Sequence, residues 1–223
     1  MRILAISDEV TDALYHPNFQ QLTGDIDLLV SCGDLPYGYM DFIVTQARVA
    51  RAVFVHGNHD KTMVSADGER WADPPGWTNL DRRVVYFREL DLIVAGLQGS
   101  ILYSGETQYQ YTEREMAGRA LKLIPQLLVS RARTGRYLDI LVTHAPAQGI
   151  HDGPRGAHQG FPIHLRLIRR FEPRLLLHGH NHRYGQEAWH TRYLQTDVVN
   201  VHPYRTIDID ADGTTIGRRR RHG

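Results

Sequence analysis

Five short runs of apolar residues, rich in β-branched side chains, recur along this chain, and a polar cluster follows each of them. Runs of this length that are apolar at most positions are typical of strands buried on both faces of a sheet. They constrain the fold strongly, because each such strand needs cover on both sides. The predicted strands are Arg2–Ile6, Asp27–Ser31, Ala52–His56, Leu138–Thr143 and Arg174–His178.

Stretches with helical spacing lie between several of these strands, and the alternation predicts an α/β layered fold. We expect Pro125 to interrupt the longest stretch, because proline removes a helical hydrogen bond. The predicted helices are Tyr39–Ala50, Thr112–Arg133 and His164–Phe171.

Two regions depart from this alternation. Arg83–Phe87 and Leu92–Ala95 flank a short polar connection and predict a hairpin. From about Glu187 onward, short segments such as Val198–Val201 predict a β-rich C-terminal part arranged as a meander. The basic tail, residues 218–223, is interpreted as a solvated terminus rather than a nucleic-acid contact.

Length and composition limit the class of protein. With 223 residues and 42% hydrophobic content, residues 1–223 can form one domain with a substantial core. A net charge of +1 gives no reason to expect a membrane or nucleic-acid partner. The single cysteine, Cys32, excludes an internal disulfide and favours a reducing compartment. No segment resembles a secretory leader or a membrane span, so we expect a cytoplasmic protein.

The polar groups after the five predicted strands are the candidate functional residues. Ligands collect at the carboxyl ends of strands in open α/β sheets, so groups far apart in the sequence can converge there. These groups are Ser7–Asp8, Gly33–Asp34, Gly57–Asn58–His59–Asp60, Thr143–His144 and Gly179–His180–Asn181–His182.

The residue types in this set suit a site for two metal ions. Carboxylate, imidazole and amide oxygen without thiolate favour Mn, Fe, Zn or Ni. Two ions about 3.5–4 Å apart can polarise a phosphoryl oxygen and hold a hydroxide for in-line attack. A histidine beside them that binds no metal can protonate the leaving oxygen.

Each motif also has a simpler interpretation when taken alone. Asp34 could shape a turn, and His144 could be a buried histidine of the core. His180 and His182 resist such an interpretation, because residues two apart on an extended chain point the same way. Turn chemistry does not predict that all five motifs follow strands, so we favour the metal site.

The order of the motifs, from Asp8 to His182, resembles that of the calcineurin-like metallophosphoesterase family. The family pattern is Asp-x-His, Gly-Asp, Gly-Asn-His with Asp or Glu, a His, and Gly-His-x-His. The resemblance implies a four-layer α/β/β/α sandwich, two mixed sheets flanked by helices, with the site at the strand tips. The loop after Thr143 is similar to the Thr-His-x-Pro-Pro loop of a subgroup that includes the metallophosphoesterase-domain proteins, with Ala147 at the second proline.

The resemblance also implies roles for individual residues. Asp8 and His182 would hold the first ion, Asp34 would bridge both ions, and three further residues would hold the second. The implied metal ligands are Asp8, Asp34, Asn58, His144, His180 and His182.

Four other residues have implied or possible roles around the ions. His59 would protonate the leaving oxygen or contact the phosphate, and Asp60 would orient His59 by a hydrogen bond. Asp152 and His158, in the loop Ala145–Phe161, are candidate substrate contacts, although they could equally fix the turns of that loop.

The chain departs from the family pattern at Val10, which stands where the family has a histidine ligand of the first ion. Asp8, Asp34 and His182 with water still make a usable but weaker site. Glu9 replaces the histidine only if the chain turns sharply, and Asp12 only if a helical turn begins after Asp8. In a further alternative the first site stays empty.

These features predict a metal-dependent phosphoesterase that attacks its substrate with a metal-bound hydroxide and uses His59 as proton donor. We favour a phosphodiesterase, because a first site with fewer ligands suits a singly charged diester better than a doubly charged monoester. The alternative is a weakened family member that serves as a nucleotide-binding or protein-interaction scaffold. The expected partner is a small phosphate ester such as a nucleotide; the sequence specifies neither the substrate nor the oligomeric state.

Overall fold

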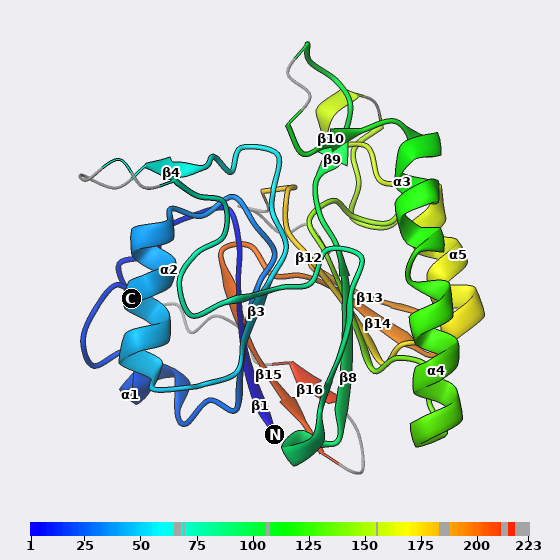
Figure 1. Ribbon diagram of the computed structural model, residues 1–223. Helices are drawn as coiled ribbons and strands as arrows, with labels where there is room; N and C mark the ends of the chain where they lie inside the picture. Colours follow the sequence, from blue (N-terminus) through cyan, green and yellow to red (C-terminus); the bar gives the residue numbers. More distant parts are fainter. Residues whose placement is uncertain are drawn as a thin grey trace.

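The predicted buried strands pair into two six-stranded sheets that face each other, with helices on both outer faces (Figure 1). The computed structural model describes residues 1–64, 68, 70–105, 108–154, 156–182, 188–210 and 214–216. The arrangement confirms the predicted α/β/β/α sandwich of two mixed sheets.

The first sheet holds the N-terminal strands in parallel, with the last part of the chain added at one edge. Its order is β16 (Thr214–Ile216), β15 (Tyr204–Ile209), β1 (Arg2–Ile6), β2 (Leu28–Ser31), β3 (Ala52–Phe54) and β6 (Thr78–Asn79). β15 runs antiparallel to β1, whereas β1, β2, β3 and β6 are parallel. Helices α1 (Gln20–Thr23) and α2 (Tyr37–Ala47) cover its outer face.

The second sheet has parallel central strands and an antiparallel strand at each edge. Its order is β13 (His190–Tyr193), β14 (Thr196–Asn200), β12 (Leu175–His178), β11 (Ile140–Thr143), β8 (Leu92–Leu97) and β7 (Val84–Phe87). β7 and β8 form the predicted hairpin, joined by the short 3-10 turn Arg88–Leu90. Helices α3 (Glu113–Leu121), α4 (Ile124–Thr134) and α5 (Pro162–Phe171) cover its outer face.

Alternate residues of one strand pack into different layers. In β1, Ile3 and Ala5 belong to the core between the sheets, whereas Leu4 and Ile6 pack under α2. A period of two with both faces covered explains why consecutive positions of these strands are apolar.

The long predicted helix is divided in two, but the break precedes the proline. α3 ends at Leu121 and α4 begins at Ile124, so Pro125 lies in the first turn of α4, where the missing N–H costs nothing. Thr112 and Glu115 form a capping box that fixes the start of α3.

The C-terminal part does not form a meander of its own, contrary to our expectation. β13 and β14 extend the second sheet, and the chain then passes through Val201–Pro203 to β15 and β16 of the first sheet. The basic tail, 218–223, lies outside the described residues. Among the residues described, no helix has both the length and the apolar composition needed to cross a membrane.

Smaller elements lie near the strand tips. They are the strand pairs β4 (Met63–Val64) with β5 (Arg70–Trp71) and β9 (Ser100–Ile101) with β10 (Gln110–Tyr111), and the 3-10 turn Gly156–His158.

Candidate metal centre

The strand ends converge from both sheets at the edge away from the N-terminus of β1 (Figure 1). β1, β2 and β3 carry Asp8, Asp34 and the Asn58 loop, and β11 and β12 carry His144 and the His180 loop. Ligand candidates from the two halves of the sequence therefore meet across the interface between the sheets.

Tight backbone turns at the strand ends bring the candidate ligands together. Asp8, Asp34 and His180 have positive φ values of 66°, 57° and 67°, which non-glycine residues adopt at some energetic cost, often at functional sites. A Cβ on Gly57 would lie 2.0 Å from Asp34 Oδ1, and one on Gly179 would lie 2.4 Å from Asp8 Oδ2. These two motif positions therefore need glycine, because the neighbouring carboxylate occupies the space of a side chain.

Four residues form a buried cluster of donor atoms, which we call the second-ion side: Asp34, Asn58, His144 and His180. His144 Nε2 lies at its centre, 3.4 Å from Asp34 Oδ2, 3.0 Å from Asn58 Oδ1 and 3.1 Å from His180 Nδ1. The donor atoms of Asp34, His144 and His180 all lie within 4.8 Å of one another. Such spacing suits the ligands of one ion.

The tautomers of the two histidines show why this cluster fits a cation. His144 Nδ1 lies 2.7 Å from Cys32 O and His180 Nε2 contacts Ala157 O, so each of these nitrogens donates its hydrogen to a carbonyl. In the neutral rings, the other two nitrogens then present lone pairs to each other and to the oxygens of Asp34 and Asn58. Converging lone pairs repel unless a positive charge lies between them, so these residues fit a metal ion.

The charges of the cluster lead to the same conclusion. Burial opposes ionisation of His144, but the charge and hydrogen bond of Asp34, together with the charge of Asp8 and the carbonyl of Cys32, raise the pKa of His144 to about 9. Burial acts against Asp34 as well, yet the charge of His144 lowers the pKa of Asp34 to about 2. Burial and the charge of His144 lower the pKa of His180 to about 4. A metal-free cluster therefore binds one proton where a metal ion can bind.

Asp8 and His182 lie beside this cluster in a more open setting. The buried Asp8 carboxylate accepts hydrogen bonds from His180 N at 3.1 and 2.9 Å, and His182 Nε2 lies 3.7 Å from Asp8 Oδ1. Burial works against the Asp8 charge, but the His182 hydrogen bond and the charge of His144 lower the pKa of Asp8. The His182 side chain is 45% exposed, and Val10 is exposed as well.

The candidate proton donor and its partner are arranged differently from our expectation. His59 is exposed, and its backbone N–H donates to Asp34 Oδ1 at 2.7 Å. The hydrogen bonds shown for the Asp60 carboxylate come from Gly57 N at 2.9 Å and Leu35 N at 3.2 Å, and His56 Nδ1 lies 3.6 Å away. Asp60 therefore holds the backbone of the loop that carries His59.

The two candidate substrate residues fall into different settings. Asp152 accepts a hydrogen bond from Gly160 N at 3.2 Å, which fixes its loop. His158 is exposed, its Nδ1 lies 2.8 Å from Asn181 Oδ1, and its ring centre is 5.4 Å from that of His180. His158 is thus the better placed of the two to meet a substrate.

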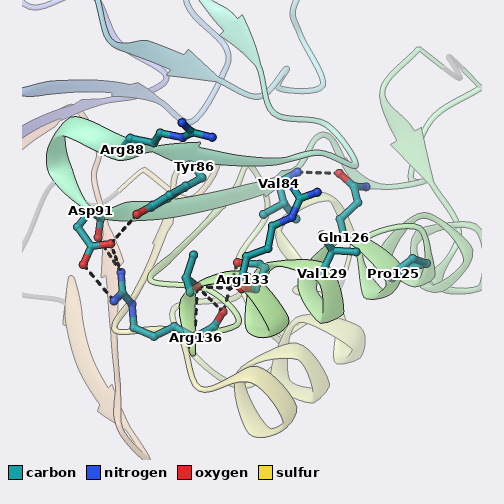
Figure 2. Close-up of a pocket in the computed structure, with 11 residues that line it drawn as sticks. Val84, Tyr86, Arg88, Asp91, Pro125, Gln126, Val129, Arg133 and Arg136 are labelled. Carbon is teal, nitrogen blue, oxygen red and sulfur yellow. Dashed lines mark hydrogen bonds and ion pairs between the residues drawn. The ribbon is translucent and has the colours of Figure 1, made fainter.

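Two cavities differ in their relation to the site. One of about 470 Å³ is lined by Asp34, His59 and Lys61 among others, so it opens directly beside the candidate centre. Another of about 820 Å³ lies between β7 and α4, where Gln126 bonds Val84 N and Arg136 pairs with Asp91 (Figure 2). None of the described residues that line the second cavity is a candidate ligand, so of these two cavities only the smaller adjoins the candidate centre.

His202, which the motif pattern does not include, follows β14 and is buried with its ring stacked on that of His182. A signal was present, because the segment Val198–Val201, with three valines in four residues, is followed directly by this histidine, much as motifs follow the five predicted strands.

A family model described as calcineurin-like phosphoesterase matches residues 1–184. The chain belongs to the calcineurin-like phosphoesterase family. Membership supports metal-dependent hydrolysis of phosphate esters in general, with divalent ions bound, although some members of the family are not catalytic.

Two solved structures are similar to this chain in fold. TT1561 of Thermus thermophilus is 20% identical with a TM-score of 0.65, and the match covers 97% of each chain. GAP50, the anchor in the inner membrane complex of Plasmodium, is 13% identical with a TM-score of 0.55, and the match covers 97% of this chain and 83% of that one. A search of curated proteins found no match.

Proposed function

We propose that the chain is a phosphodiesterase that holds two divalent transition-metal ions at the strand tips. The observation that carries the proposal is the convergence of lone pairs on the second-ion side, centred on His144 Nε2. Asn58, His144 and His180 would hold one ion, Asp8 and His182 the other, and Asp34 would bridge them. We expect Mn, Fe, Zn or Ni, because the donors are oxygen and imidazole nitrogen.

When bound, the ions supply positive charge to the phosphate oxygens and lower the pKa of the attacking water. The residues of the chain supply position and a proton. The Asp60 carboxylate holds the loop, and the bond from His59 N to Asp34 fixes His59 beside the bridging carboxylate. The exposed His59 ring lines the 470 Å³ cavity, where it would donate a proton to the leaving oxygen.

A diester fits the charges of the site better than a monoester. Val10 supplies no imidazole to the first ion, so acidic side chains such as Asp8 and Asp34 make up a larger share of its donors and leave less positive charge for the phosphate. A diester carries one negative charge, and a monoester close to two. We further propose a nucleotide diester, because Tyr103 lies beside Asn58, accepts a hydrogen bond from its amide at 3.1 Å, and is partly exposed for stacking on a base.

The test compares purified protein with Mn²⁺ on bis-p-nitrophenyl phosphate and on p-nitrophenyl phosphate. We expect faster hydrolysis of the diester, and a loss of about 10³-fold or more in Asp34→Ala, because both ions lose a ligand. Asp41→Ala, which removes an exposed carboxylate on α2, is the matched control and should keep full activity. Full activity in Asp34→Ala would refute the mechanism.

A protein-interaction or nucleotide-binding scaffold is the second candidate. The observation that favours it is Val10, which removes a ligand from the first ion. Tight binding of one ion without hydrolysis of either substrate would support the scaffold over the enzyme.

A further inference from the structure

Val10 leaves the first ion short of one ligand, and the backbone just before it turns sharply. Asp8 has a φ of 66°, and Glu9 N donates to Ser7 O at 2.8 Å. This tight turn ends the extended conformation, in which neighbouring side chains would point to opposite faces. The Glu9 side chain can therefore point to the same side of the chain as the Asp8 side chain.

Glu9 meets a histidine from a distant part of the sequence. Glu9 Oε2 lies 3.3 Å from His202 Nε2, and the His202 side chain is 1% exposed. The His202 ring stacks on the ring of His182, with centres 4.6 Å apart and planes 10° apart. We call Asp8, Glu9, His182 and His202 the first-ion side.

The backbone holds His202 at this position. His202 N donates to Asn200 Oδ1 at 3.0 Å, and Pro203 O accepts a hydrogen bond from Ser7 N at 3.0 Å. The segment between β14 and β15 is thus attached directly to the end of β1, one residue before Asp8. His202 therefore occupies a fixed place beside the first-ion side.

We propose that Glu9 Oε2 and His202 Nε2 complete the first metal site in place of the histidine absent at Val10. This inference rests on the metal centre of the proposed function. Metal bonds of about 2.0–2.2 Å place two ligand atoms of one ion about 3–4 Å apart. The Glu9–His202 distance of 3.3 Å and the His182–Asp8 distance of 3.7 Å both fit this spacing.

Rotation of the Glu9 and His182 side chains would bring the two pairs together on one ion. Glu9 and His182 are 43% and 45% exposed, so their side chains can rotate, whereas Asp8 and His202 are fixed by burial. A carboxylate and an imidazole also match the preference of the same transition metals as the second-ion side. The alternative is purely structural: Glu9 and His202 form an ion pair that supports the His182 ring by stacking.

The test is calorimetric titration of the metal-free protein with Mn²⁺, which does not depend on activity. We expect two ions in the wild type. His202→Gln and Glu9→Gln should each lower the affinity for the more weakly bound ion by about tenfold or more. The affinity for the more tightly bound ion should stay unchanged. His16→Gln and Asp12→Asn, which alter an exposed histidine and an exposed acid nearby, are matched controls and should keep both ions.

His202→Phe separates coordination from support, because phenylalanine can stack on His182 but cannot bind metal. We expect it to lose the weaker ion, and Val10→His in the same background to restore that ion. The inference would be overturned if both His202→Phe and Glu9→Gln left the affinity for the weaker ion unchanged. It would also be overturned if Asp12→Asn alone abolished binding of that ion. If His202→Phe fails to fold by circular dichroism, Glu9→Gln decides the question, since Glu9 is partly exposed. A wild type that binds no ion would refute the proposed function itself.

Discussion

The two sides of the candidate centre present similar donor types in contrasting settings. The second-ion side is buried in the core, and its imidazole nitrogens are fixed by bonds to the carbonyls of Cys32 and Ala157. On the first-ion side, two of the four side chains, Glu9 and His182, are nearly half exposed. The comparison teaches that packing fixes every side chain of the second-ion side, whereas only Asp8 and His202 are fixed in this way on the first-ion side.

Replacing one histidine on each side should give the largest difference between the two sides, measured as the loss of unfolding free energy. His144→Ala leaves the buried Asp34 without its positive partner, which typically costs about 3–5 kcal/mol of unfolding free energy. His182→Ala removes a partly exposed ring and should cost about 1 kcal/mol or less. Urea unfolding of the metal-free proteins measures both, and equal losses would contradict the distinction.

The dependence of metal binding on pH should separate the two sides next. Burial opposes the charge of His144, but mainly Asp34 raises the pKa of His144 to about 9. At a pH below 9, a metal ion that binds on the second-ion side would therefore displace a proton from His144. Affinity for the tighter ion should therefore rise with pH, by up to about tenfold per unit, and level off near pH 9. Titrations between about pH 6 and pH 9.5 test this, and an affinity independent of pH would contradict it.

The same group predicts how the metal-free protein responds to pH. The folded pKa of His144, about 9, lies above the ordinary value of 6.5, so the stabilisation that it contributes is fully present below pH 6.5. This contribution is lost as the pH rises through 9. Thermal unfolding in the presence of a chelator should show a falling melting temperature over this range, with a smaller fall in His144→Gln.

The smallest expected effect concerns the rim of the second-ion side. Tyr103→Phe removes the hydroxyl that accepts a hydrogen bond from Asn58 Nδ2, which orients the amide toward His144. Because water can replace a partly exposed hydroxyl, we expect affinity for the tighter ion to fall only about twofold to fivefold. Calorimetry measures the change, and Tyr86→Phe on the distant edge strand β7 serves as the control.

The sequence pattern within short segments was enough to predict the buried strands and the order of strands and helices. The five buried strands follow from continuous apolar runs, and their alternation with helices predicts the layers. Which sheet a strand joins depends on pairing over long distances, and the sequence around Tyr204–Ile209 carries no signal that it pairs with Arg2–Ile6. The predicted meander was wrong for that reason.

Prediction of the site was limited in the same way. The motifs indicated which residues gather at the strand tips, because each follows a strand. The partners of Asp60 depend on how its loop folds against Leu35, and the place of His202 depends on the passage between the two sheets. Neither could be inferred from spacing.

The candidate ligands divide between the two sheets in a way that has a mechanical consequence. Asp8, Asp34 and Asn58 come from the first sheet, and the three histidines after β11 and β12 come from the second. Ions bound between them would act as cross-braces that join two halves of the chain more than 80 residues apart in sequence. Sliding of one sheet over the other would then stretch metal–ligand bonds, so ions bound there would also set the stiffness of the sandwich.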